Sequence, residues 1–261
     1  LTDVHRMREK VRSADKMAAI GELSTAIAHE IRAPLASICG SIEMLSQELD
    51  LSGDNRRLME LVVKESDRLD RIITDFLEFA RLRPPQFEPV DVEDCLAEVL
   101  LLLRHSSGVG REVAIEVQEN TPHACVFADD EQIRQVFLNL IMNACEAMGG
   151  RGRLAIRIDG VAKSLREEAE SEQCVSIDFA NNGPAIPPEA LPRIFEPFFT
   201  TKEGGTGLGL AIVARIVDSH GGHVRAASAE GQGAVFTIVL PIHAGSDSVR
   251  REELEETFIG F

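Results

Sequence analysis

The chain has 261 residues and a formal net charge of −16, from 27 basic and 43 acidic side chains. This acidic balance argues against nucleic acid as a partner, because phosphates favour a basic surface. Hydrophobic residues make up 44% of the chain, too many for a disordered protein, and no apolar run approaches the ~20 residues that cross a bilayer. We expect one to three domains, at roughly 150 residues each. We also expect a cytoplasmic location without membrane contact by this chain, whereas an anchor in a longer parent protein stays open.

The five cysteines are an odd number, are widely spaced and contain no Cys-x-x-Cys pair. This pattern favours small buried thiols in a reducing compartment over zinc ligands or a disulfide framework.

Residues 1–82 are predicted to be helical almost throughout. Apolar residues recur every three, four or seven positions in two stretches, which gives each stretch an apolar stripe. A turn at 51–55 separates the stretches, with Gly53 and Asp54 as helix stop and start signals. We therefore predict a helical hairpin at 15–82 that pairs with a second copy as a four-helix bundle. A coiled-coil-like helix at 1–14 leads into it.

The dipeptide Pro84-Pro85 marks the clearest domain boundary, because proline lacks the amide donor and restrains its predecessor. We place a hinge linker at 83–88 and a second domain at 89–243, followed by a charged tail at 244–261. Helices and strands interleave in the second domain, which predicts an α/β sandwich. The predicted helices are 92–103, 130–148 and 208–219. The predicted strands are 112–118, 124–127, 153–158, 175–181, 223–228 and 234–240, and the acidic stretch 163–173 is predicted to be a solvated loop.

His29 lies in the sequence Ala-His-Glu-Ile-Arg-Ala-Pro-Leu. Two residues along a helix turn the side chain by about 200°, so His29 points away from the stripe formed by Ile27 and Ile31. Its imidazole is a good phosphoryl acceptor when a carboxylate such as that of Glu30 holds the ring in the right tautomer. Pro34 is expected to bend the helix nearby. Taken alone, a single histidine on a polar helix face is more often a solvated surface residue.

The second domain carries four elements rich in glycine or asparagine. Asn139 and Asn143 are four residues apart on one helix, so their amides face the same way and can offer oxygen to a magnesium ion. A turn at 181–186 follows a strand, and the segment 204–210 leads directly into a helix. Glycines there let backbone amides approach phosphates at a helix start. The last element is 231–233, and each is weak when taken alone.

In order, the motifs HEIRAPL, NLIMNA, NNGP, IFEPFFTTK and GTGLGLAI resemble the catalytic core of a bacterial two-component sensor histidine kinase. The resemblance covers about residues 15–241 and is nearest to the nitrogen-regulator type. It implies a multi-domain α and α+β fold. The hairpin would be the dimerisation and histidine-phosphotransfer domain, and the α/β sandwich would be an ATP-binding domain of the gyrase and histidine-kinase type.

The resemblance also implies residue roles. His29 corresponds to the phosphoacceptor and Glu30 to its acid/base neighbour. Asn143 corresponds to the Mg²⁺ ligand, and Asn139 stands where hydrolytic relatives keep a glutamate. The implied nucleotide-binding residues are Asn139, Asn143, Asn181, Gly183, Lys202, Gly205, Thr206, Gly207, Leu208 and Gly209. The implied anchors of the lid over the triphosphate are Phe195, Phe198 and Phe199.

Three positions depart from the family pattern. Asn181 replaces the usual aspartate that accepts a hydrogen bond from the adenine amino group, which predicts roughly tenfold weaker nucleotide binding. Ala185 replaces a glycine of the same turn. Ala33 replaces an asparagine or threonine that orients a water for dephosphorylation of the partner, so we expect weak phosphatase activity.

The expected function is that of an ATP- and Mg²⁺-dependent protein-histidine kinase. Its expected partners are a second copy of the chain, bound through the hairpin, and the receiver domain of a response regulator. A nucleotide-binding signalling scaffold that transfers no phosphate is the main alternative, favoured by Asn181 and Ala185. A gyrase-class nucleotide hydrolase is a third, opposed by Asn139 and by the His29 motif.

Overall fold

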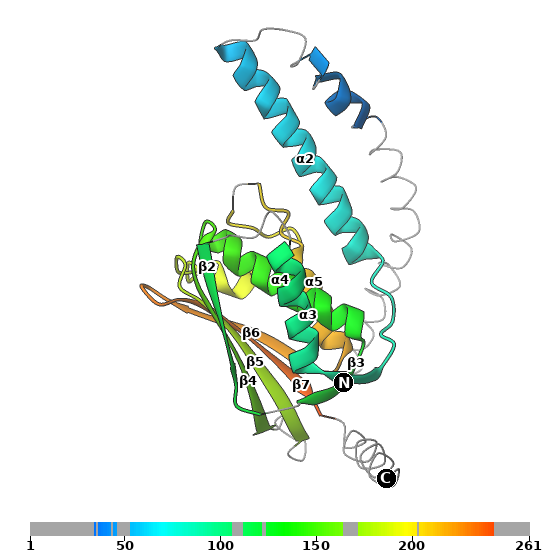
Figure 1. Cartoon of the computed structure of the whole chain (residues 1–261), viewed down its shortest axis with the longest axis vertical. Helices are drawn as coiled ribbons and strands as arrows, with labels where there is room; N and C mark the ends of the chain where they lie inside the picture. The colour runs from blue at the N-terminus through cyan, green and yellow to red at the C-terminus, as the bar shows by residue number, and fades with distance from the viewer. Residues whose placement is uncertain are drawn as a thin grey trace, which may run out of the picture. The chain divides into compact units, whose positions relative to one another are not determined.

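The structure is a computed structural model (Figure 1). It describes residues 34, 36–42, 44–45, 53–105, 112–121, 124–163, 172–202 and 204–242. Its contacts define two compact units, the first combining 1–83 with 200–208 and the second combining 84–199 with 209–261. His29, Glu30 and Ala33 lie outside the described residues, as do the predicted leading helix and the charged tail.

The first unit is built on helix α2 (Asp54–Ala80). Described residues between 34 and 45 are also helical. Helix α2 follows Gly53, whose φ of 60° suits a residue without a side chain. It carries exposed apolar side chains at Leu58 (59%), Leu61 (53%) and Leu69 (47%). This helix therefore presents an apolar stripe that its own chain leaves largely uncovered.

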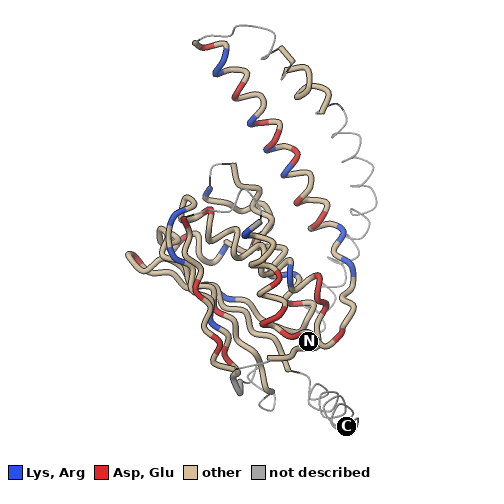
Figure 2. Tube along the Cα trace, viewed as in Figure 1, with Lys and Arg blue, Asp and Glu red and all other residues tan. Residues whose placement is uncertain are grey.

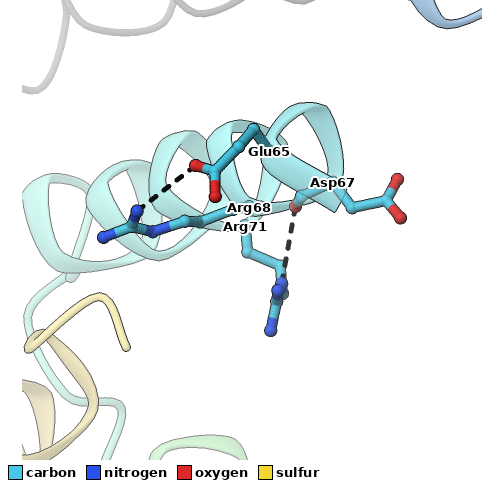
Figure 3. Close-up of polar contacts among 4 residues, drawn as sticks. All are labelled: Glu65, Asp67, Arg68 and Arg71. Carbon is cyan, nitrogen blue, oxygen red and sulfur yellow. Dashed lines mark hydrogen bonds and ion pairs between the residues drawn. The ribbon is translucent and has the colours of Figure 1, made fainter. Parts of the chain in front are cut away.

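Charged residues of both signs are interspersed along α2 (Figure 2). The Arg68 guanidinium lies 3.3 Å from the Glu65 carboxylate one turn away, and Arg71 Nε donates to the Asp67 carbonyl at 3.4 Å (Figure 3). Exposed pairs of this kind stabilise a helix by only a few tenths of a kcal/mol. These pairs therefore contribute little to the stability of α2.

The second unit contains a five-stranded sheet in the order β2-β4-β5-β7-β6. Strands β2 and β4 run parallel, and the other neighbours are antiparallel. A separate antiparallel pair is formed by β1 and β3. The strands are β1 (Glu88–Asp91), β2 (Glu112–Glu119), β3 (Cys125–Ala128), β4 (Arg151–Lys163), β5 (Glu172–Asn181), β6 (His223–Ala229) and β7 (Gly233–Pro241). The helices are α3 (Val92–His105), α4 (Asp130–Ala147), η1 (Leu191–Arg193) and α5 (Gly209–Ser219).

Helices α4 and α5 cover one face of the five-stranded sheet (Figure 1). Alternate side chains of β4 point into this layer, so Leu154, Ile156 and Ile158 are fully buried. Phe137 of α4 meets Phe179 of β5 with ring centroids 5.8 Å apart. The predicted α/β sandwich is therefore confirmed, with its core between the helix layer and the sheet.

The sequence misplaced three features of the second unit. Strand β1 falls at the predicted end of the linker, and its short Glu-Pro-Val-Asp sequence has no clear alternation. Strands β4 and β5 extend into the stretch that was predicted to be a loop, because they pair as far as Lys163 with Glu172. The 3₁₀ turn η1 was not predicted.

All five cysteines are free, and Cys95, Cys145 and Cys174 are buried, so the prediction of buried thiols is confirmed for three of them. Among the described residues, no helix is long and apolar enough to cross a membrane.

Candidate nucleotide-binding site

Helix α4 holds the two asparagines that the sequence predicts beside the phosphates. Asn139 is half-buried, and its Nδ2 is shielded from solvent without a hydrogen-bond partner among the described residues. Its Oδ1 lies 3.7 Å from where a Cβ on Gly209 would stand, so the first residue of α5 passes close to this amide. A buried amide without a partner is costly, and a polar ligand between α4 and the start of α5 would satisfy it.

Asn181 ends strand β5 and is buried, with 4% of its surface exposed. In the amide orientation that suits both neighbours, Nδ2 donates to the Ala234 carbonyl at 3.1 Å. Oδ1 accepts from the Gly183 amide at 3.0 Å in the same orientation. A Cβ on Gly233 would stand only 1.9 Å from the Asn181 carbonyl oxygen, and Gly233 has a φ of 79°. Only glycine fits there, which keeps β7 close to Asn181.

The turn after Asn181 packs on the C-terminal end of α4. A Cβ on Gly183 would lie 3.2 Å from Met148 Cγ and 3.3 Å from the Ala147 carbonyl oxygen. Ala147 is four residues beyond Asn143, or about 6 Å along the helix. The structure thus places the predicted base-binding turn and the predicted Mg²⁺ ligand at the same end of α4.

The phenylalanine segment before the lid is held by local contacts. The Arg193 guanidinium lies 4.4 Å from the centroid of the Phe199 ring and pairs with Glu196 at 3.0 Å. Phe198 is 57% exposed and has a φ of 66°, the only positive φ outside glycine among the described residues. Such a backbone costs about 1–3 kcal/mol, so the chain stores strain immediately before the lid.

The segment 200–208 groups with the helical unit and contains four of the five predicted lid residues, the exception being Gly209. Thr206 Oγ1 donates to the Asp75 carboxylate of α2 at 2.6 Å. Lys202 N donates to Thr200 Oγ1 at 3.1 Å, and the same hydroxyl leaves no room for a side chain on Gly205. Asp75 carries no motif, so the sequence did not identify it as a contact of the lid.

Burial shifts the pKa of two thiols, those of Cys145 on α4 and Cys95 on α3. It raises the pKa of the Cys145 thiol on α4 and, with the nearby Asp130 carboxylate, raises the pKa of Cys95 to about 12. Neither thiol is a nucleophile at neutral pH. Among the described residues no group of three or more His, Cys, Asp or Glu side chains could hold a metal. The predicted Mg²⁺ ligand is the amide oxygen of Asn143 on α4.

Comparison with known proteins identifies both units. Residues 19–85 match the His Kinase A (phospho-acceptor) domain, and residues 128–244 match the histidine kinase-, DNA gyrase B-, and HSP90-like ATPase domain. The chain belongs to the sensor histidine kinase family. The match to the first domain includes the position of His29, and the match to the second includes Asn139, Asn143 and Asn181.

Curated relatives align over most of this histidine kinase core. It is 35% identical to the signal transduction histidine-protein kinase AtoS of Escherichia coli over 93% of the chain and 38% of AtoS. It is 34% identical to the sensor histidine kinase ZraS of Salmonella typhimurium over 92% of the chain and 50% of ZraS. It is 35% identical to the sensory histidine kinase/phosphatase NtrB of Rhodobacter capsulatus over 89% of the chain and 64% of NtrB. The chain thus spans between about a third and two thirds of these relatives.

Solved structures agree with this assignment. The complex of the histidine kinase ThkA with the response regulator TrrA gives a TM-score of 0.63 at 28% identity, covering 93% of this chain and 68% of that one. Full-length ShkA in complex with AMPPNP gives a TM-score of 0.59 at 31% identity, covering 85% and 46%. The fold of both domains is therefore that of the histidine kinases.

Proposed function

We propose that this chain is the core of an ATP-dependent protein-histidine kinase that phosphorylates His29 and passes the group to an aspartate of a response regulator. The observation that carries the proposal is the orphaned, buried amide of Asn139 beside Gly209, within a domain of the ATPase family. The same chain supplies a phospho-acceptor domain that contains His29. The ShkA–AMPPNP and ThkA–TrrA complexes support ATP and a response regulator as the partners of related chains.

The nucleotide would lie along α4. Asn181 would meet the adenine amino group, while Asn139, Asn143 and the start of α5 at Gly209 would meet the phosphates. The remaining residues of this proposed nucleotide set are Gly183, Lys202, Gly205, Thr206, Gly207 and Leu208. Magnesium fits the amide chemistry of Asn143 and would neutralise charge on the triphosphate. The helix start and backbone amides act locally, so the net charge of −16 does not oppose binding.

In the transfer step, a ring nitrogen of His29 attacks the γ-phosphorus. A nitrogen–phosphorus bond forms, the bond to the β–γ bridging oxygen breaks, and ADP leaves with its electron pair. Glu30 orients the ring and takes the proton that the imidazole loses. Asn139 is a neutral amide and activates no water, which favours transfer to a side chain over hydrolysis. Positioning contributes most of the acceleration.

We further propose that the domains fall at 15–82 and 89–243, joined by the linker 83–88, and that a second copy covers the apolar stripe of α2. The exposed Leu58, Leu61 and Leu69 support this dimer, because a lone hairpin leaves that stripe in water. Weak phosphatase activity is part of the proposal, since Ala33 has no polar group to orient water.

A nucleotide-binding scaffold without transfer remains the second candidate, favoured by Asn181 and Ala185. Titration with Mg-ATP followed by incubation with γ-labelled ATP separates the two candidates. Binding with label on the protein supports the kinase, and binding without label supports the scaffold.

A further inference from the structure

Asp129 lies where three parts of the second unit meet, and only 2% of its surface is exposed. Its Oδ1 accepts a hydrogen bond from the backbone N–H of Gln132 at 3.1 Å, and this bond caps the start of α4. Its Oδ2 accepts a hydrogen bond from the backbone N–H of Gln86 at 2.7 Å, and Gln86 immediately follows Pro84-Pro85. Its own amide donates to His220 Nε2 at 2.9 Å, at the end of α5. One buried carboxylate residue therefore joins the linker to both helices.

His220 completes this junction and is also buried, with 4% exposed. A backbone amide can only donate, so Nε2 is the acceptor and the proton sits on Nδ1, which lies 2.8 Å from the Ile216 carbonyl oxygen. The imidazole meets the Phe87 ring edge to face at 5.3 Å, and Phe87 stacks on Phe127 at 5.8 Å. Both linker residues are thus held in place: Gln86 by the hydrogen bond from its backbone N–H to Asp129, and Phe87 by the contact of its ring with His220.

The junction lies at the start of α4 and the end of α5, whereas Asn139 lies midway along α4, beside the start of α5. Helices α4 and α5 pack against each other, with Asn139 beside Gly209 and Asp129 beside His220. The helical rise places Asp129 about 15 Å from Asn139, and Gly209 about 17 Å from His220. Because the start of α5 lies beside Asn139 and its end lies beside Asp129, the helices run antiparallel and connect the linker to the proposed nucleotide residues.

We propose that Asp129 is a positioning residue for phosphoryl transfer: it fastens the linker to α4 and α5 and so restricts how the catalytic domain reaches His29. This role rests on the proposed kinase function. Opening the junction frees Gln86 and Phe87, which lengthens the tether between α2 and β1 by about 7 Å. Nucleotide binding is unaffected, because Asn139 and Gly209 keep their helices. The alignment of the nucleotide with His29 that permits transfer is then less populated, because the released linker allows more conformations.

The variant Asp129→Asn distinguishes the bond between Asp129 and the linker from the capping of α4 by the same side chain. Asparagine caps helices as well as aspartate does, so one oxygen still serves α4. Its second polar atom is the side-chain amide nitrogen Nδ2, which cannot accept from the Gln86 backbone N–H. Asp129→Ser provides the same test with a shorter side chain. Gln86→Pro removes the donor and leaves Asp129 intact. Asp91→Asn is the matched control, because Asp91 caps α3 by accepting from Glu93 N at 3.0 Å.

The experiment measures the autophosphorylation rate constant against ATP concentration, and amide exchange over residues 86–90, in the full chain. Asp129→Asn and Gln86→Pro should each lower the rate constant at saturating ATP by about 3- to 30-fold. The half-saturating ATP concentration should stay within about twofold. The double variant should be no slower than the slower single variant, because both remove one bond. Exchange should accelerate in Asp129→Asn, whereas Asp91→Asn should leave rate and linker exchange unchanged.

Three results of the rate measurements would overturn the proposal: an unchanged rate constant in Asp129→Asn, multiplying effects in the double variant, or a half-saturating concentration that rises as much as the rate falls. The last result would mean that Asp129 only stabilises α4. Exchange does not depend on phosphoryl transfer. A wild-type chain that never labels His29 would therefore refute the kinase function, whereas unchanged exchange in Asp129→Asn would refute the fastening itself.

Discussion

Replacing Asn181 with aspartate should strengthen ATP binding and, at the same time, weaken the contact between the end of β5 and the start of β7. A hydrogen bond from the adenine amino group to a carboxylate is worth ~1.5–3 kcal/mol, against ~0.5–1.5 kcal/mol for a neutral acceptor. The difference of about 1.4 kcal/mol corresponds to about a tenfold lower Kd for Mg-ATP. A carboxylate can only accept hydrogen bonds, whereas the asparagine amide can also donate one. The aspartate variant should therefore prefer ATP, which has the adenine amino group, over GTP more strongly than wild type does.

The structural cost of Asn181→Asp comes from Ala234. The asparagine donates Nδ2 to the Ala234 carbonyl at 3.1 Å in a buried position, and an aspartate would set two acceptors against each other there. Loss of this bond should cost about 1–3 kcal/mol of folding stability. In the absence of nucleotide the Tm should therefore fall by several degrees, about 4 °C per kcal/mol.

Isothermal titration with Mg-ATP and Mg-GTP, together with thermal unfolding, measures both effects. Asn182→Asp is the matched control. It adds the same charge one residue away and keeps the oxygen that accepts from Arg153 N at 2.8 Å. An Asn181→Asp chain that unfolds cooperatively but binds ATP no more tightly than wild type would refute the assignment of Asn181 to the base.

Three further predictions concern other parts of the chain. Ala33→Asn should raise dephosphorylation of the phosphorylated response regulator, measured as release of inorganic phosphate; an unchanged rate would contradict the role assigned to this position. Asp75→Ala should raise ATP affinity about fivefold, because Thr206 would no longer have to break its hydrogen bond to the Asp75 carboxylate when ATP binds. A lower affinity would show that this hydrogen bond supports binding. Above pH 9 the unfolded chain ionises Cys95 while the folded chain keeps its proton up to a pKa of about 12. Folding stability should therefore fall as the pH rises through this window. Cys95→Ala should flatten that slope in denaturant titrations, and an equally steep slope would contradict the assignment.

The elements with a strong period or a clear signal were predictable from sequence. Helix α4 was predicted from the Asp129 cap and its apolar spacing, and the structure begins it at Asp130. Strands β6 and β7 were predicted to within about one residue of each end. In these segments local pattern and tertiary packing favour the same structure.

The rest depended on partners that are distant in the sequence. Strand β1 has only four residues and exists because β3 pairs with it. The junction of Gln86, Asp129 and His220 joins residues up to 134 positions apart, and the only sequence signal among them is the capping role of Asp129. The positive φ of Phe198 and the contact of Thr206 with Asp75 likewise arise from tertiary packing. Site residues could be proposed from the motifs and their roles stay predictions, whereas these tertiary contacts could not be predicted from the sequence.

Transfer to a histidine is tested most directly by incubating the purified chain with γ-labelled ATP and Mg²⁺. We predict covalent label that is lost in acid, survives alkali and is absent from the His29→Gln variant, which should still bind the nucleotide. A wild-type chain that binds ATP and stays unlabelled, or a His29→Gln chain that still takes up the label, would contradict the account.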